Sequence, residues 1–103
     1  MKPEDLYAGF VHLHILYHTS KGPIFGLWIV EELARHGYQM SPGTLYPALH
    51  RLEHAGYLTS QRQLVQGHFR RVYSITPTGL EILVQAKDKV RELFGELFER
   101  SHA

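Results

Sequence analysis

The sequence predicts a mainly α-helical protein with one small β-hairpin and a long helix at its C-terminal end. Three observations support this fold class. Apolar residues recur at helical spacing over four segments, two β-rich runs flank a glycine in the second half, and 103 residues suit a single domain. The composition, 44% hydrophobic and 20% charged, is that of a folded globular chain and not of a disordered one.

The first two helices are expected over residues 5–18 and about 24–36. The first has two neighbouring apolar strips, one formed by Leu6, Phe10, Leu13, Leu16 and Tyr17 and the other by Tyr7, Val11 and Ile15. A helix that is apolar on two sides must be covered on two sides. Pro23 suits the first turn of the second helix, and Gly37 suits its end.

The third helix begins within "SPGTLYPALHRLEHAGYL", residues 41–58. Ser41 or, preferably, Thr44 is expected to cap it, which would leave Pro47 at the third helical position, where a proline removes no intrahelical hydrogen bond. Helical spacing then predicts a buried side of Leu45, Ala48, Leu49, Leu52 and Gly56, and an outer side of Tyr46, Pro47, His50, Arg51 and His54.

An antiparallel hairpin and a long helix complete the chain. The hairpin is predicted from the β-rich runs of residues 57–66 and 69–76, which are separated by Gly67 and His68. Thr76 then caps a helix with Pro77 at its first position. About 24 residues at 1.5 Å each make a rod of about 36 Å, which is longer than one small domain can cover and therefore favours dimerisation.

Positive charge is concentrated in one third of the chain. Residues 41–76 hold Arg51, Arg62, Arg70 and Arg71 against Glu53 alone, whereas acidic residues outnumber lysines and arginines in both flanking segments. Arginine suits phosphate groups and guanine edges. Three helices, a hairpin and a further helix are also the order of elements in a winged helix-turn-helix, whose third helix enters the major groove of DNA.

These segments resemble the PadR family of bacterial transcription regulators. The matching positions of the third helix are Gly43, Thr44, Leu45, Tyr46, Pro47, Leu49, Arg51, Leu52, Glu53 and Gly56, and those after the hairpin are Tyr73, Thr76 and Gly79. The resemblance covers essentially the whole chain. It implies a homodimer of winged helices joined through the first and last helices, acting mostly as a repressor that a ligand or stress relieves, in the short subgroup with one C-terminal helix.

On this interpretation residues 1–76 form a winged-helix DNA-binding domain and residues 77–103 a C-terminal dimerisation helix, together one structural unit. The partners on this interpretation are double-stranded DNA and a second copy of the chain, with a small-molecule inducer as a further candidate. The residues expected to bind DNA are Ser41, Gly43, Thr44, Tyr46, Pro47, His50, Arg51, His54, Arg62, His68, Arg70 and Arg71. Those expected at the dimer interface are Tyr7, Val11, Ile15, Leu83, Val90, Phe94, Leu97 and Phe98.

Two histidine patterns leave metal chemistry open as an alternative. His50 to His54 spell H-x-x-E-H, the spacing of an inverted zinc peptidase, but a catalytic zinc needs a third protein ligand and the chain is short for a substrate cleft. His14 and His18, with His12 nearby, suggest a metal sensor; without cysteines, surface or interface histidines are the favoured interpretation. We therefore expect no enzyme, no cofactor and no metal.

Three further expectations concern ligands, partners and location. Trp28 lies on the same side of the second helix as Glu31 and Arg35, where it either packs under a neighbouring helix or lines a ligand cavity.

A winged helix used only for protein contacts is the alternative to a DNA-binding domain. No apolar run is long enough for a membrane span and the N-terminus is unlike a signal peptide, so we expect a cytoplasmic protein without membrane contacts.

Overall fold

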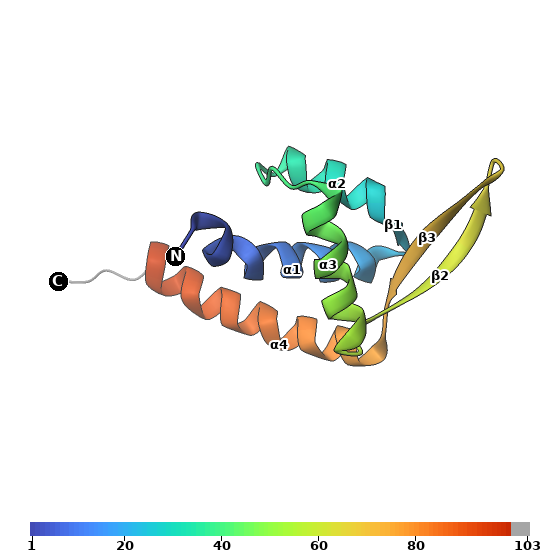
Figure 1. Ribbon diagram of the computed structural model, residues 1–103. Coiled ribbons are helices and arrows are strands. Elements are labelled where there is room, and N and C mark those ends of the chain that lie inside the picture. The colour runs from blue at the N-terminus through green and yellow to red at the C-terminus, as the bar shows by residue number, and fades with distance from the viewer. Residues whose placement is uncertain (100–103) are drawn as a thin grey trace.

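The computed structural model describes residues 1–99 as a helical protein with a small antiparallel sheet (Figure 1). Its elements are α1 (Pro3–Lys21), β1 (Ile24–Phe25), α2 (Gly26–Arg35), α3 (Pro42–His54), β2 (Leu58–Val65), β3 (His68–Ile75) and α4 (Pro77–Phe94), which continues as a π-helix (Gly95–Glu99). The predicted fold class is confirmed. The last four residues of the expected 77–103 helix lie outside the described residues. Among residues 1–99, no helix combines the length and apolarity that crossing a membrane requires.

The sheet has three strands in the order β1-β3-β2, one more than the predicted hairpin. Ile24 lies opposite Tyr73 and Phe25 opposite Val72, so these two residues extend the sheet instead of opening the second helix. A β-branched and an aromatic residue favour a strand, and the free edge of β3 supplies their partners. Helix α2 therefore begins only at Gly26, with Phe25 as its N-cap.

The hydrophobic core lies between α1, α2, α3 and the base of the sheet. Helix α1 faces it with Val11, Ile15 and Leu16. The expected dimer residues Val11, Ile15 and Leu83 are thus wrong as surface positions, since each is less than a tenth exposed within one protomer. The reason is that α2, α3 and β3 cover this side of α1, and that Leu83 of α4 belongs to the same buried cluster. Of the other strip of α1, Leu16 is buried, whereas Leu6, Phe10 and Tyr17 are exposed.

Ser41, and not Thr44, is the N-cap of α3. Pro42 then takes the first helical position, which suits proline. Pro47, however, lies inside the helix. Because proline has no amide hydrogen, the carbonyl of Gly43 loses its intrahelical donor. Leu45, Ala48, Leu49 and Leu52 are buried as predicted. Gly56 is exposed instead, with a φ of +85° that suits the glycine ending a helix.

Thr76 joins three elements at the start of α4. Its Oγ1 donates to the carbonyl of Gly56 at 2.6 Å and accepts from the amide of Gly79 at 3.0 Å, while its own amide donates to the carbonyl of Tyr57. This confirms the predicted cap. Gly79 packs so closely here that a Cβ would lie 2.2 Å from the Tyr57 oxygen. The end of α3, the end of β3 and the beginning of α4 therefore form one rigid corner.

Candidate nucleic-acid interface

The exposed side of α3 is divided into a central stripe and two flanks. Gly43, Pro47, His50 and His54 follow helical spacing along the stripe, and all four are exposed. On one flank, Thr44 and Arg51 line a groove with the N-terminal half of α1. On the other flank, Tyr46 lines a groove with the wing, the hairpin of β2 and β3. The stripe is the part of the helix that is free to approach another molecule.

Tyr46 is the one predicted DNA-binding residue that is not fully exposed. Its ring packs on the backbone of Gly26, where an added Cβ would lie 2.7 Å from Cε1 and 2.8 Å from the hydroxyl. It also packs against the core cluster. This placement differs from the free outward position predicted for Tyr46. The reason is that α2 packs against α3, and Gly26 at its start leaves space for the Tyr46 ring because it has no side chain.

Changing Gly26 to alanine is expected to destabilise the protein by about 1–2 kcal/mol, since the new methyl group must displace the Tyr46 ring. In a Tyr46→Ala background the same change is expected to be neutral or slightly stabilising, because the obstacle is gone. Urea unfolding of the four proteins at one concentration gives the coupling free energy, expected at about 1 kcal/mol. Additive effects of the two substitutions would contradict the contact.

The wing carries three arginines, and two of them are direct cross-strand neighbours. Arg62 lies opposite Arg71, and Gln63 lies opposite Arg70. The guanidinium of Arg62 lies 4.2 Å from the centre of the Phe69 ring, and that of Arg70 lies 5.7 Å from the centre of the Phe25 ring. Like charges placed opposite each other destabilise a hairpin unless an anion is near. The wing therefore maintains an arginine pair that favours phosphate.

Arg71 also connects the wing to α3. It donates to Ser60 Oγ at 3.0 Å, and Ser60 Oγ donates to Glu53 Oε2 at 2.7 Å. Glu53, the only acidic residue of 41–76, is thus half-buried and turned toward the wing. This arrangement leaves the outer surface of α3 and the wing without an exposed carboxylate from that segment. It also directs Glu53 away from a shared site with His50 and His54.

All of the other predicted DNA-binding residues are exposed on these two elements. Those of α3 and its cap are Ser41, Gly43, Thr44, Pro47, His50, Arg51 and His54, and those of the wing are Arg62, His68, Arg70 and Arg71. The structure thus brings together residues that are up to 30 positions apart in the sequence, because the wing folds back beside α3 (Figure 1). Arg51 departs from this arrangement, since it faces α1 and lies next to His12.

A second polar cluster lies on another part of the molecule. It joins His14 and His18 of α1 with His36, the C-cap of α2, and with Glu32 of α2. Burial lowers the pKa of His14 and of His18, as it does for His12. Hydrogen bonding to Arg35 lowers the pKa of Glu32. The sequence indicated the His14–His18 pair through its four-residue spacing; His36 and Glu32 were not predicted, because only tertiary packing brings them there.

Trp28 is two-fifths exposed and lies beside this histidine cluster. Its ring meets the His18 ring edge to face, with 5.3 Å between the centroids. It lines a shallow groove with residues of the turn between α1 and β1. The ring is therefore held by a neighbouring helix on one side and open to solvent on the other.

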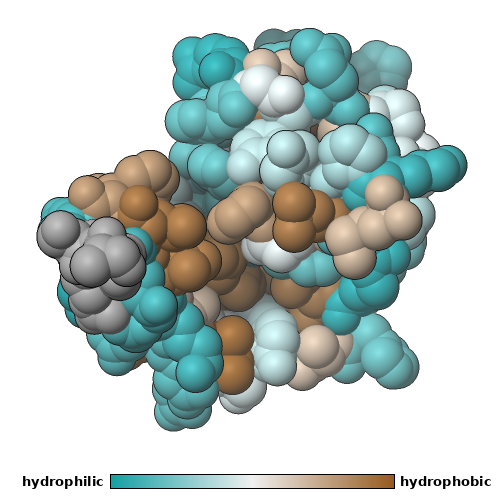
Figure 2. All heavy atoms as spheres, turned by 90° about the vertical axis from the view of Figure 1, so that its left-hand side faces the viewer, coloured by the Kyte–Doolittle hydropathy of each residue, from teal (hydrophilic) through white to brown (hydrophobic). Residues whose placement is uncertain are grey.

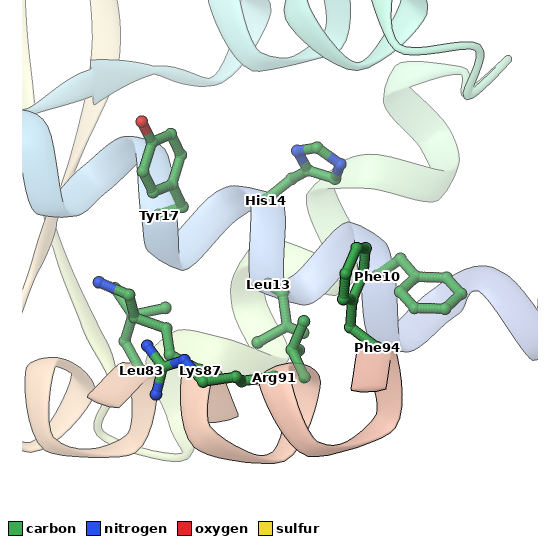
Figure 3. A pocket seen from close by; sticks show the side chains of 9 residues that line it. Phe10, Leu13, His14, Tyr17, Leu83, Lys87, Arg91 and Phe94 are labelled. Carbon is green, nitrogen blue, oxygen red and sulfur yellow. The ribbon is translucent and has the colours of Figure 1, made fainter. Parts of the chain in front are cut away.

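An apolar groove of about 520 Å³ separates α1 from α4. It is lined by Phe10, Leu13, His14, Tyr17, Leu83, Lys87, Val90, Arg91 and Phe94. Figure 3 shows Leu13 pointing toward α4, while His14 rises from α1 on the opposite side. Figure 2 shows hydrophobic side chains gathered in a hollow on the face that carries the end of α4. Of the expected dimer residues, Tyr7, Val90, Phe94, Leu97 and Phe98 are exposed.

Comparisons with known proteins agree with this arrangement. The family model of the PadR-like transcriptional regulators matches residues 15–85. The transcriptional regulator Rv3488 of Mycobacterium tuberculosis is 48% identical over 87 residues, which cover 84% of this chain and 81% of that protein.

Two solved structures have the same fold. A PadR family transcriptional regulator from Eggerthella lenta superposes with a TM-score of 0.78 at 30% identity, covering 94% of this chain and 88% of that one. A PadR-like transcriptional regulator from Bacillus cereus gives a TM-score of 0.76 at 26% identity, covering 94% and 99%. Because the family model spans well over half of the chain and the Mycobacterium relative is matched along most of its length, the chain belongs to the PadR-like family of transcriptional regulators.

Proposed function

We propose that the chain is a sequence-specific DNA-binding repressor that acts as a homodimer on a palindromic operator. The observation that carries this proposal is the surface formed by the central stripe of α3 and the wing arginines, which is exposed and bears no carboxylate from residues 41–76 except the inward-turned Glu53. A duplex presents one negative charge about every 1.7 Å along its axis, so such a surface is complementary to DNA.

The two elements would divide the work of recognition. The N-terminal half of α3 has small residues and no acidic side chain in its first turn, so it can enter the major groove closely and its amide end favours phosphate. Pro47 and His50 are exposed on the central stripe, and His50 can read base edges by hydrogen bonding. Arg62, Arg70 and Arg71 would contact the flanking backbone, which fixes position and not sequence.

Dimerisation would occur through the exposed apolar side chains of α1 and α4. Phe94, Leu97 and Phe98 are between 48% and 72% exposed, and neighbouring exposed apolar side chains of this kind mark protein–protein contacts. Residues 1–76 then act as the DNA-binding domain and residues 77–103 as the dimerisation segment, whose described part is α4 and its π-helical continuation. Two-fold symmetry requires an inverted-repeat operator, with half-sites one or two helical turns, about 34 or 68 Å, apart.

Replacing Arg70 and Arg71 together with alanine is expected to weaken binding to all DNA sequences about equally. Each phosphate contact contributes about 0.9 to the slope of log K against log salt, so the slope should fall by about 2 per protomer and affinity by on the order of 100-fold. The measurement is a salt series of binding titrations on the DNA upstream of the chain's own gene and on unrelated DNA of equal length, with footprinting to locate the operator.

The control is Lys21→Ala with Lys89→Ala, which removes two exposed cations from helices outside the interface. It should leave the slope nearly unchanged. His50→Ala, in contrast, is expected to reduce the difference in affinity between operator and unrelated DNA. A wild-type chain that protects no DNA at any salt concentration would instead indicate a protein-binding winged helix.

A further inference from the structure

Three imidazole rings converge on the side of α1 that faces α2. His14 and His18 lie one turn apart on α1, and His36 follows the last turn of α2. One ring nitrogen of each lies within 4.8 Å of the others. No other group of three or more potential metal ligands occurs among residues 1–99. The cluster is separate from the α3 and wing surface, so the recognition of DNA does not account for it.

A nearly buried carboxylate completes the cluster. The Glu32 side chain is only 10% exposed, and its Oε2 lies 3.1 Å from His36 Nε2 and 3.8 Å from His18 Nε2. Its Oε1 accepts a hydrogen bond from Arg35. The site thus contains three nitrogen donors and one oxygen donor on two helices that are packed together.

The nitrogen of His18 in this site lacks a hydrogen-bond partner. His18 Nε2 is shielded from solvent and makes no hydrogen bond to the described part of the chain. A buried polar atom without a partner costs about 1–3 kcal/mol, which a bound cation would recover. A neutral imidazole nitrogen offers the lone pair that a metal ion needs.

We propose that His14, His18 and His36, with the carboxylate of Glu32, bind one divalent transition-metal ion of the zinc type. Three imidazoles and a carboxylate are a typical donor set for Zn²⁺, with nitrogen ligands at about 2.0–2.1 Å. Ligands of a tetrahedral zinc site lie about 3.4 Å apart, so the rings need to approach one another by on the order of 1 Å. His36 is partly exposed and can make that movement through its side chain. Hard cations such as Mg²⁺ prefer oxygen ligands and should not compete.

The ion would have a structural consequence for the segment before α3. His36 is followed by only five residues before Pro42 begins the helix. A bound ion would fasten the end of α2 to α1 and so hold that short connection in place. The proposal itself concerns metal binding alone and does not depend on the DNA-binding function.

The test is a titration of the metal-free full-length chain with Zn²⁺, without DNA, by calorimetry and by fluorescence. Trp28 is the only tryptophan and touches the His18 ring, so its emission should change as the site fills. We expect one ion per chain. His14→Ala and His36→Ala should each weaken zinc binding by about 10- to 100-fold, and Glu32→Gln by about 10-fold. Circular dichroism of the variants checks that each remains folded.

The matched control is His12→Gln, which removes a histidine of the same helix that is not in the cluster; its affinity should equal that of the wild type. The proposal is overturned if the wild-type chain binds no zinc, if His36→Ala binds as tightly as the wild type, or if Mg²⁺ binds equally well. Because the assay contains no DNA, a failure of the proposed regulator function would not affect its result.

Discussion

Replacing Phe94 with aspartate is expected to convert the proposed dimer into a monomer. Phe94 is half exposed on the last turn of α4, where its ring packs on Phe98 with 5.0 Å between the centroids and lines the groove toward α1. Burying such a side chain contributes about 1.5–3 kcal/mol, and a two-fold interface contains it twice. Since two uncompensated carboxylates would also have to be buried, the dimer should weaken by more than about 5 kcal/mol, or more than about 4,000-fold in dissociation constant.

Light scattering during size-exclusion chromatography measures this directly. At micromolar concentration, the wild type should have twice the chain mass of 11.9 kDa, and Phe94→Asp should have the mass of a single chain. Gln85→Asp adds the same charge on the opposite, exposed side of α4 and should remain dimeric. The helical circular dichroism of Phe94→Asp should persist, because the residue is outside the core. A dimeric Phe94→Asp protein, or a monomeric wild type, would exclude this interface.

Replacing Gly79 with alanine is expected to cause the largest loss of folding stability of any single methyl addition to a glycine of this chain. The new Cβ would lie 2.2 Å from the carbonyl oxygen of Tyr57 and 2.8 Å from Ile75 Cγ1. A backbone carbonyl cannot rotate aside as a side chain can, so the start of α4 must move. We expect a cost on the order of 3 kcal/mol and a fall in melting temperature of more than about 10 °C.

Gly9→Ala is the matched comparison. Gly9 also lies in a helix, but its Cβ would meet nothing within 4 Å, so alanine should stabilise α1 by about 0.5–1 kcal/mol. Thermal unfolding of both variants at one protein concentration gives opposite signs if the close approach at Gly79 is real. A Gly79→Ala protein as stable as the wild type would show that this corner can relax.

The sequence was sufficient for most of the elements and for one side of α3. Helical spacing correctly predicted the buried Leu45, Leu49 and Leu52, and turn chemistry correctly predicted the Thr76 cap. These features depend on neighbours only a few residues away. The predicted position of Pro47 in α3 was wrong. Two prolines and two residues that could cap the helix lie within seven positions, and capping preference alone favoured Thr44 over Ser41.

The remaining errors concern contacts between distant segments. Periodicity identified two apolar strips on α1 but could not indicate which one faces the core, because that depends on where α2 and α3 pack. Three contacts join residues that are 18 or more positions apart: the pairing of β1 with β3, the packing of Tyr46 on Gly26, and the addition of His36 to His14 and His18. No local pattern carries such information.

The corner at Thr76 has a mechanical consequence for regulation. The hydroxyl and the amide of Thr76 connect the end of α3 and the base of the wing to α4, the helix through which the subunits of the proposed dimer would meet. A small rotation of α4 would therefore move α3 and the wing together, and the distance between the two α3 helices of a dimer would change with it. In the proposed dimer, an effector that alters the crossing angle of the subunits would then release the proposed operator without touching any of the side chains proposed to contact DNA.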